Sequence, residues 1–357
     1  MISWSSATLA ELQYGPMPPC LERAVQDVTV PGGTQTLSNL SGGSYHVWAP
    51  GDTPLRLANA SLGAVAGTSY PMAVLVGIGP QFAKYVTDFT SEALVADGIW
   101  ELSSLGQIAA VAGAPSLPST GTFLDVGAHV GSWTFGFAQA GFRVIAIEPL
   151  LPNVAALQAT RCLHPSLAER VTIVPAVVGS ASQLGPCHLL APAKNDLGNV
   201  ALQCADPAAG NASVADYVNA MQTGNTLAYF HHHRRFKQLL PWPLSLLTLD
   251  ALLLDGASDI RLPTSLDVVK IDTTGSECAV LEGGKRALLH KLRPKLLVIN
   301  VDLAASEACA RTLAAQHSFE VFELQVPEQA QTGSSHPLRS KHPRGKHIVL
   351  VDRTARL

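Results

Sequence analysis

Four polar side chains lie at the ends of short apolar runs, where a buried strand would reach the edge of a sheet. They are Asp125 in TFLDV, Glu148 after FRVIAI, Asp272 after LDVVKI and Asn300 in KLLVIN. In a doubly wound sheet, substrates bind beyond the carboxyl ends of the strands. Carboxylates placed there can accept hydrogen bonds from hydroxyl groups, attract a cation or take a proton. The four residues therefore predict one site of polar chemistry, assembled from distant parts of the chain.

The first two of these residues belong to a strand, glycine turn, helix and strand in immediate succession. Residues 122–126 and 142–147 are apolar enough for buried strands, and 132–140 have apolar residues at helical spacing, followed by Gly141 as a C-terminal cap. With such short connections the two strands must be parallel and the crossover right-handed. This unit is the predicted centre of the fold.

The turn inside this unit indicates which ligand it binds. Gly127 and Gly131 let the backbone approach a ligand, and Glu148, 23 positions after Asp125, is placed to bind a ribose diol. A dinucleotide fingerprint reads G-x-G-x-x-G, whereas this turn reads D-x-G-x-x-x-G. Asp125 would repel a pyrophosphate but suits a ligand with an ammonium or sulfonium group. Two alternatives remain, namely glycines that serve packing alone and a site for NAD or FAD.

The rest of the chain predicts a mostly parallel α/β sheet with an antiparallel edge. Residues 1–84 are rich in Gly, Pro, Ser and Thr and predict a small, irregular, β-rich N-terminal α+β extension. Residues 85–357 form the main domain, with its core sheet from 122 and variable substrate loops at 180–245. Further strands are predicted at 171–178, 266–271 and 295–301, an antiparallel edge pair at 319–324 and 346–351, and helices at 102–112, 153–162, 276–289 and 306–315.

Composition limits the classes of function. The chain has 357 residues, of which 47% are hydrophobic and 14% charged, as in an ordered globular protein. A net charge of −3 gives no electrostatic case for nucleic acid as a partner. No apolar run is long enough to span a bilayer, and the N-terminus lacks the basic and apolar regions of a signal peptide. We expect a soluble protein of the cytoplasm or an organelle lumen, with its compartment and oligomeric state undetermined.

No metal site is predicted. The six cysteines are scattered without a C-x-x-C pair, so they indicate neither a zinc site nor a dense disulfide scaffold. The segment FHHHRRF contains His231–His233 and could bind a metal ion or an anionic substrate. Three adjacent histidines cannot all face one ion on a regular element, so a solvated basic loop is the favoured interpretation.

Several separated patterns resemble those of the FkbM-type S-adenosylmethionine-dependent methyltransferases. They are Asp88 with GIWE at 98–101, LDVGAHVG at 124–131, IEP at 147–149 with Asn153, TLD at 248–250, VKIDTTGSE at 269–277 and VLEG at 280–283. They cover roughly 85–352. The resemblance implies a class I methyltransferase, Rossmann-like fold, S-adenosylmethionine as cofactor, and methylation of a hydroxyl on a small molecule or glycan.

The resemblance also implies roles for individual residues. Asp272 is the candidate for orienting the acceptor or acting as base, with Lys270 and Glu277 in support. Glu148 would bind the ribose, with Asn153 nearby. The turn residues Asp125, Gly127, Ala128, His129 and Gly131 would hold the methionine part of the cofactor. Pro149, which follows Glu148, belongs to the same set, and Ala176 and Val177 would contact the adenine.

The chain departs from the family pattern at two acidic positions. Thr274 and Asn300 stand where the family usually has Glu, and His129 stands where Asn is commoner. These departures leave open a second function, a catalytically inactive protein that binds the cofactor in a regulatory role. A nicotinamide-dependent oxidoreductase is a weaker alternative, disfavoured by the missing third glycine.

Overall fold

The computed structural model describes the core of the chain and parts of its connections. The described residues are 55–60, 70–75, 88, 90–91, 93–94, 98, 100–101, 105–114, 116–118, 120–183, 187–192, 198, 200–204, 236–239, 246–255, 264–324 and 347–354. The predictions for most of the N-terminal extension, for His231–His233 and for the loop at 327–345 lie outside these residues.

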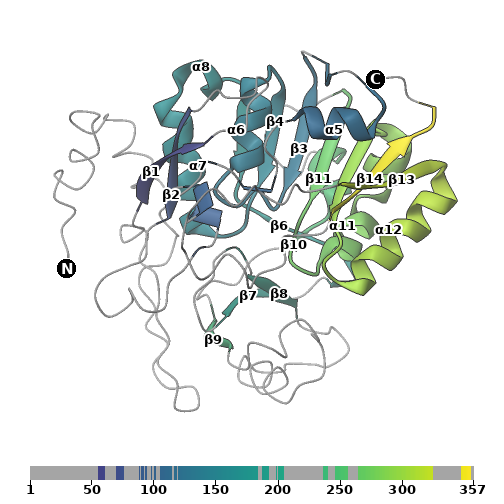
Figure 1. Cartoon of the computed structure of the whole chain (residues 1–357). Coiled ribbons are helices and arrows are strands. Elements are labelled where there is room, and N and C mark those ends of the chain that lie inside the picture. The colour runs from purple at the N-terminus through teal and green to yellow at the C-terminus, as the bar shows by residue number, and fades with distance from the viewer. Residues whose placement is uncertain are drawn as a thin grey trace, which may run out of the picture.

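A seven-stranded sheet forms the centre of the molecule (Figure 1), in the order β13-β14-β12-β11-β3-β4-β5. Neighbouring strands from β12 to β5 pair in parallel, whereas β14 pairs antiparallel with both β12 and β13. The predicted doubly wound sheet with an antiparallel edge is thereby confirmed. The strands are β3 Thr122–Val126, β4 Arg143–Ile147, β5 Val171–Val174, β11 Val268–Ile271, β12 Leu296–Asn300, β13 Phe319–Leu324 and β14 His347–Asp352.

Helices cover both faces of the sheet because its strands alternate between two apolar cores. In β12, Leu296 and Val298 point into one core, whereas Leu297 and Ile299 point into the other. Helices α5, α6 and α7 pack on the first face, and α10, α11 and α12 on the second. The helices are α5 Gly106–Val111, α6 Ser132–Gln139, α7 Leu151–Leu163, α8 Pro165–Ala168, α10 Leu249–Leu253, α11 Glu277–Gly283, the π-helix Ala287–Lys291 and α12 Ala304–His317. None of the described helices has both the length and the apolar character needed to cross a membrane.

Two predicted elements are interrupted in the structure. The strand predicted at 171–178 splits into β5 and β6 Val177–Val178, because Pro175 cannot donate to a strand ladder. The helix predicted at 276–289 ends as α11 at Gly283, before the π-helix begins. A Cβ on Gly283 would lie 1.9 Å from the carbonyl oxygen of Gly179, so a neighbouring loop requires glycine there.

Short strands outside the main sheet complete the described part. The hairpin of β1 Leu55–Ala60 and β2 Tyr70–Leu75 matches the predicted β character of the N-terminal region. It packs on α7, where the backbone N–H of Ala73 donates to Thr160 Oγ1 at 2.9 Å. The remaining strands are β6 with β10 Leu246–Leu247, and a three-stranded sheet of β7 Cys187–Pro192, β8 Ala201–Cys204 and β9 Phe236–Leu239.

The order of the strands fixes where a ligand should bind. From β3 the chain winds outward through β4 and β5, and later from β11 through β12 in the opposite direction. The reversal lies between β3 and β11, which are neighbours in the sheet. In such sheets ligands bind beyond the carboxyl ends at this switch point. The predicted site residues lie at this edge.

Candidate active site

The turn after β3 is bound to both neighbouring strands. The backbone N–H groups of Gly127 and Ala128 donate to the carbonyl of Ile147 on β4. Gly127 has φ +80, and a Cβ there would lie 1.9 Å from the carbonyl oxygen of Asp272. Gly131, with φ +94, begins α6 without a side-chain cap. The glycines therefore serve close approach of the backbone to β11 as well as helix entry.

Glu148 is hydrogen-bonded to the backbone of this turn and of the segment after β4. Its Oε2 accepts from the backbone N–H of His129 at 2.8 Å, and its Oε1 accepts from the N–H of Leu150 and from Asn153 Nδ2 at 2.9 and 3.2 Å. Burial raises the pKa of Glu148, and the nearby His129 and these donors only partly offset it. A carboxylate has about four acceptor positions, so one remains for a ligand hydroxyl.

Asn153 offers a second acceptor beside Glu148. Its side chain is buried, and its Oδ1 has no hydrogen-bond partner within the part of the chain that the structure describes. A buried amide oxygen without a donor is costly, and a ligand hydroxyl or amine would remove this cost. The position predicted near the ribose thus has the acceptor that a ribose needs.

The remaining predicted cofactor residues lie around this carboxyl edge. Pro149 and Ala176 are half-buried, whereas Val177 is buried against Leu246. His129 adopts φ +52, and its Nε2 lies 3.0 Å from Asp88 Oδ1. Burial raises the pKa of Asp88, but His129 and hydrogen bonds outweigh burial and lower it overall. His129 thereby ties the turn to the segment before the core sheet.

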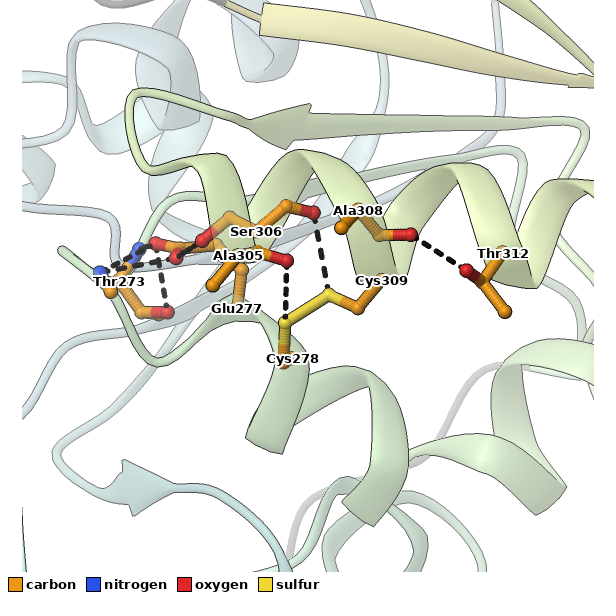
Figure 2. Close-up of a disulfide and its surroundings, with 9 residues drawn as sticks. Thr273, Glu277, Cys278, Ala305, Ser306, Ala308, Cys309 and Thr312 are labelled. Atoms are coloured by element: carbon orange, nitrogen blue, oxygen red, sulfur yellow. Dashed lines mark hydrogen bonds between the residues drawn. A yellow bond between two sulfur atoms is a disulfide. The ribbon is translucent and has the colours of Figure 1, made fainter.

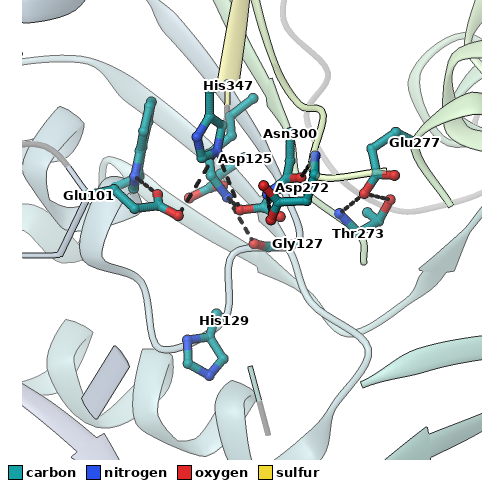
Figure 3. A network of polar contacts seen from close by, with 12 residues as sticks. Glu101, Asp125, Gly127, His129, Asp272, Thr273, Glu277, Asn300 and His347 are labelled. Atoms are coloured by element: carbon teal, nitrogen blue, oxygen red, sulfur yellow. Dashed lines mark hydrogen bonds and ion pairs between the residues drawn. The ribbon is translucent and has the colours of Figure 1, made fainter. Parts of the chain in front are cut away.

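Beneath the turn, Lys270 is held between the carboxylates of Asp125 and Asp272. Figure 3 shows these two carboxylates close together beside the backbone of Gly127. Its Nζ lies 3.6 Å from Asp125 Oδ1, 3.3 Å from Asp272 Oδ2 and 3.3 Å from the carbonyl of Gly127. Asp125 also accepts from Thr134 Oγ1 at 2.7 Å and is 0% exposed. Asp125 therefore supports the turn from below, and the ligand contact predicted for it stays a prediction.

Two residues from distant segments complete this network. His347, at the start of β14, is 0% exposed, and its Nε2 lies 3.7 Å from Asp272 Oδ2 and 4.0 Å from Glu101 Oε1. Trp133 Nε1 donates to the other oxygen of Glu101 at 2.9 Å. Only Asp272, with 22% of its side chain exposed, opens to solvent, compared with 6% for Glu101 and 5% for Lys270. Asp272 is therefore the member that a substrate can reach.

Opposite charges set the protonation of the network. Burial raises the pKa of Asp272, but Lys270 and His347 outweigh it and hold the pKa well below its usual range. Burial lowers the pKa of Lys270 and of His347, yet the surrounding carboxylates raise both above their ordinary values. At Glu101 burial outweighs the attraction of His347 and raises the pKa. Asp272 is consequently the most firmly ionised carboxylate of the network.

Glu277 shapes the loop that follows β11. Its carboxylate accepts from the backbone N–H groups of Thr273 and Gly275 and from Ser306 Oγ, at 2.6 to 3.1 Å. Thr274, inside this loop, is a non-glycine residue with φ +50. Asn300 lies beside the loop and bonds with Asp302. Glu277 is only 1% exposed. It therefore supports Asp272 by holding the backbone of the loop that follows Asp272.

A disulfide joins the two helices next to this loop (Figure 2). Cys278 of α11 and Cys309 of α12 are bonded, with Cα atoms 5.9 Å apart. Glu277, next to Cys278, and Ser306, three positions before Cys309, form the hydrogen bond described above. The scattered cysteines were not predicted to pair, since residues 31 positions apart in sequence give no spacing signal.

The sequence assigned no role to Glu101, His347 or Trp133. Only Glu101 carried a signal, because it ends the GIWE pattern of the family resemblance. His347 stood at the start of an ordinary apolar strand. Their convergence on Asp272 depends on the sheet order, which places β14 beside β12.

The model of the methyltransferase FkbM domain matches residues 125–325. No curated protein matches the chain. The solved structure of methyltransferase FkbM from Methylobacillus flagellatus KT is similar at 15% identity and TM-score 0.36, over 65% of this chain and 44% of that one. The chain thus spans less than half the length of that relative.

Two other solved methyltransferases are similarly distant. The C-terminal domain of precorrin-6Y C5,15-methyltransferase from Rhodobacter capsulatus is 16% identical, with TM-score 0.31, over 65% of this chain and 79% of its own. The T. thermophilus 16S rRNA N2 G1207 methyltransferase, solved with AdoMet and guanosine, is 14% identical, with TM-score 0.37, over 84% of this chain and 51% of its own. The family model covers more than half of the sequence, and this chain belongs to the FkbM methyltransferase family.

Proposed function

We propose that this chain binds S-adenosylmethionine beyond the carboxyl ends of β3 and β4 and methylates a hydroxyl group of a small molecule or glycan. Membership of a methyltransferase family supports the reaction type. S-adenosylmethionine, when bound, supplies a methyl group on a positively charged sulfur. The proposal for the chain's own residues concerns how they hold this molecule and its acceptor.

The chemistry of the donor set fits this cofactor. Glu148 keeps one acceptor position and Asn153 a buried oxygen without a donor, and both suit a ribose diol. This pair of acceptors is the observation that carries the proposal. Pro149 and Ala176 are the half-buried apolar candidates for the adenine. Gly127, Ala128 and Gly131 provide backbone at the methionine end.

The charge of the network favours a cationic ligand. Asp125, Asp272 and Glu101 are opposed by Lys270 and His347, so with all five ionised the network is negative by one charge. In a site that excludes water, such an excess attracts a sulfonium more strongly than it would in solution. The same charge would repel the pyrophosphate of a dinucleotide.

Asp272 is proposed to orient the acceptor hydroxyl. It is the exposed member of the network, so a hydroxyl can donate to its carboxylate. Its lowered pKa makes it a weak base, and Lys270 and His347 keep it ionised. An alcohol oxygen becomes far more acidic as it bonds to carbon, so a weak base can take its proton late in the transfer. Lys270 and Glu277 act as positioning residues, the first by charge and the second by shaping the loop.

Calorimetry on the purified chain tests the cofactor proposal. We expect S-adenosylhomocysteine or S-adenosylmethionine to bind with micromolar Kd, and Glu148→Ala to abolish binding. Glu282→Ala is the matched control, because Glu282 is an exposed acid on α11. Absence of binding to the folded wild-type chain would refute the proposal.

A second function is a cofactor-binding protein without methyl transfer. Asn300 favours it, since an amide at the end of β12 cannot accept a proton as a carboxylate could. Micromolar cofactor binding with no methylation across a broad panel of hydroxyl acceptors would support this function over the first.

A further inference from the structure

We propose that Glu101, Asp272 and His347 form a binding site for one divalent transition-metal ion. One carboxylate oxygen from each acid and one imidazole nitrogen lie within 4.8 Å of one another. The three residues come from the segment before the core sheet, the end of β11 and the start of β14. They are brought together only by the complete fold.

The distances within this cluster suit a shared ion better than direct hydrogen bonds. His347 Nε2 lies 3.7 Å from Asp272 Oδ2 and 4.0 Å from Glu101 Oε1. Hydrogen bonds to nitrogen span about 2.7–3.2 Å. Two ligands of one ion, each about 2.0–2.2 Å from it, lie at most about 4.4 Å apart. Both nitrogen–oxygen distances fall in this interval, and a small rotation of one carboxylate would complete the set.

The formal charges balance when a divalent ion is added. Asp125, Asp272 and Glu101 carry three negative charges, and Lys270 carries one positive charge. A neutral His347 with a divalent ion brings the sum to zero. Because these side chains are largely buried, a neutral sum avoids the large cost of an uncompensated charge in the interior.

Neighbouring side chains fix the orientation of the proposed ligands, as is usual around metal sites. Trp133 fixes one oxygen of Glu101, and Lys270 contacts the same Asp272 oxygen that faces His347. Glu101 adopts φ +60, which is rare for a residue other than glycine and is found where a site over-determines the backbone. Asp272 alone is open to solvent, so an ion would keep a position for an outside ligand.

The ligand types indicate the class of ion. One imidazole with two carboxylates suits Mn²⁺, Fe²⁺, Co²⁺ or Zn²⁺, whereas Ca²⁺ and Mg²⁺ prefer oxygen ligands alone. An ion at this position would bind and acidify an acceptor hydroxyl next to Asp272. That consequence rests on the proposed methyl transfer, but binding of the ion does not.

Titration calorimetry with Zn²⁺ and, separately, Mn²⁺ tests the site on the full chain after removal of metal with a chelator. Because His231–His233 could bind such ions themselves, all measurements use the background His231→Ala/His232→Ala/His233→Ala. We expect one equivalent to bind with micromolar Kd. We expect His347→Gln and Glu101→Gln each to weaken binding at least tenfold, and His290→Gln, at an exposed histidine, to leave it unchanged.

Each outcome decides the proposal. The proposal is overturned if the background protein does not bind the ion, or if the His347→Gln and Glu101→Gln variants bind it with the same affinity as the background protein. If His347→Gln does not fold by circular dichroism, Glu101→Gln decides, since its amide keeps an oxygen for Trp133. S-adenosylhomocysteine binding, measured on the same preparations, separates failure of the metal site from failure of the proposed function.

Discussion

The Nζ of Lys270 lies 3.3 Å from Asp272 Oδ2, at the point where β11 ends. The same ammonium reaches Asp125 under the neighbouring strand β3. One buried cation therefore links the turn that would hold the cofactor to the carboxylate that would orient the acceptor. This link makes the two halves of the site one electrostatic unit.

Replacement of Lys270 by Met should destabilise the protein strongly. The variant leaves Asp125 buried without its cation, and breaking a buried pair in this way costs about 3–5 kcal/mol. Urea unfolding measures the loss. Lys295→Met is the control, because its pair with Asp267 is one-third exposed and such a pair contributes about 0–1 kcal/mol. Equal losses of unfolding free energy in both variants would contradict the role of Lys270 as the partner of a buried carboxylate.

A methyl group at Gly127 should disrupt the site, whereas Gly113→Ala should be tolerated. Both glycines have positive φ, +80 and +69, but only at Gly127 would the Cβ strike backbone, whereas Gly113 has open space. We expect Gly113→Ala to cost about 1–2 kcal/mol. Gly127→Ala should cost more than about 4 kcal/mol. Thermal unfolding compares the two, and a similar shift in both would show that the close contact with Asp272 does not matter.

Neutralising Glu277 should impair turnover more than cofactor binding. Both carboxylate oxygens of Glu277 accept from the N–H of Gly275, so in Glu277→Gln the new NH2 group faces that N–H in either orientation and the loop after Asp272 shifts. Misplacement of a reacting group by about 1 Å costs roughly 10²-fold in rate. We expect this loss in kcat with cofactor Kd within about threefold of wild type. Glu282→Gln, on the exposed side of α11, should change neither.

Cofactor affinity should fall on acidification because burial raises the pKa of Glu148 above its ordinary 4.5. Protonation removes the negative charge and turns one acceptor oxygen into a donor. Binding of S-adenosylhomocysteine should therefore weaken at a pH above the pKa of an ordinary glutamate. Since the folded state holds this proton more tightly than the unfolded chain, the contribution of Glu148 to stability is present below pH 4.5 and is lost as pH rises through the folded pKa. Calorimetry at decreasing pH should show the loss in wild type, beginning above pH 4.5, and a flat, weaker profile in Glu148→Gln.

Removal of the disulfide should lower stability without abolishing the fold. Cys278 and Cys309 close a loop of 31 residues, for which chain entropy predicts about 3–4 kcal/mol. Cys278→Ser/Cys309→Ser measures it by urea unfolding, and reduction of the wild type, which also opens the disulfide of Cys162, should lower stability at least as much. Wild-type stability that does not change on reduction would show that the bond contributes nothing.

Local patterns were enough to predict the core of the fold. The strand at 122–126 was predicted with the bounds of β3, and the helix at 132–140 ends one residue earlier as α6. These elements carry strong periodicity, and Gly127 and Glu148 follow from short-range geometry. The strand predicted at 171–178 was too long, because the prediction followed the run of apolar residues and ignored the break that Pro175 causes.

Long-range contacts could not be predicted in the same way. Asp272 is 171 positions from Glu101 and 75 from His347, so no spacing rule connects them. Their approach depends on β14 lying next to β12, and on the segment before α5 that carries Glu101 to Asp272. Asp125 was expected to face a ligand, but strand polarity alone cannot show that Lys270 and Thr134 enclose it.

The position of β14 has a consequence for the order of folding. Among the described strands it is the last along the chain, yet it fills the space between β12 and β13. Until residues 347–352 are made, β12 keeps an open edge and β13 has no neighbour in the sheet, and exposed edges of this kind favour aggregation of nascent chains. His347 arrives with the same strand. The site therefore acquires its final polar member only in the step that closes the sheet, and an incomplete chain cannot carry it.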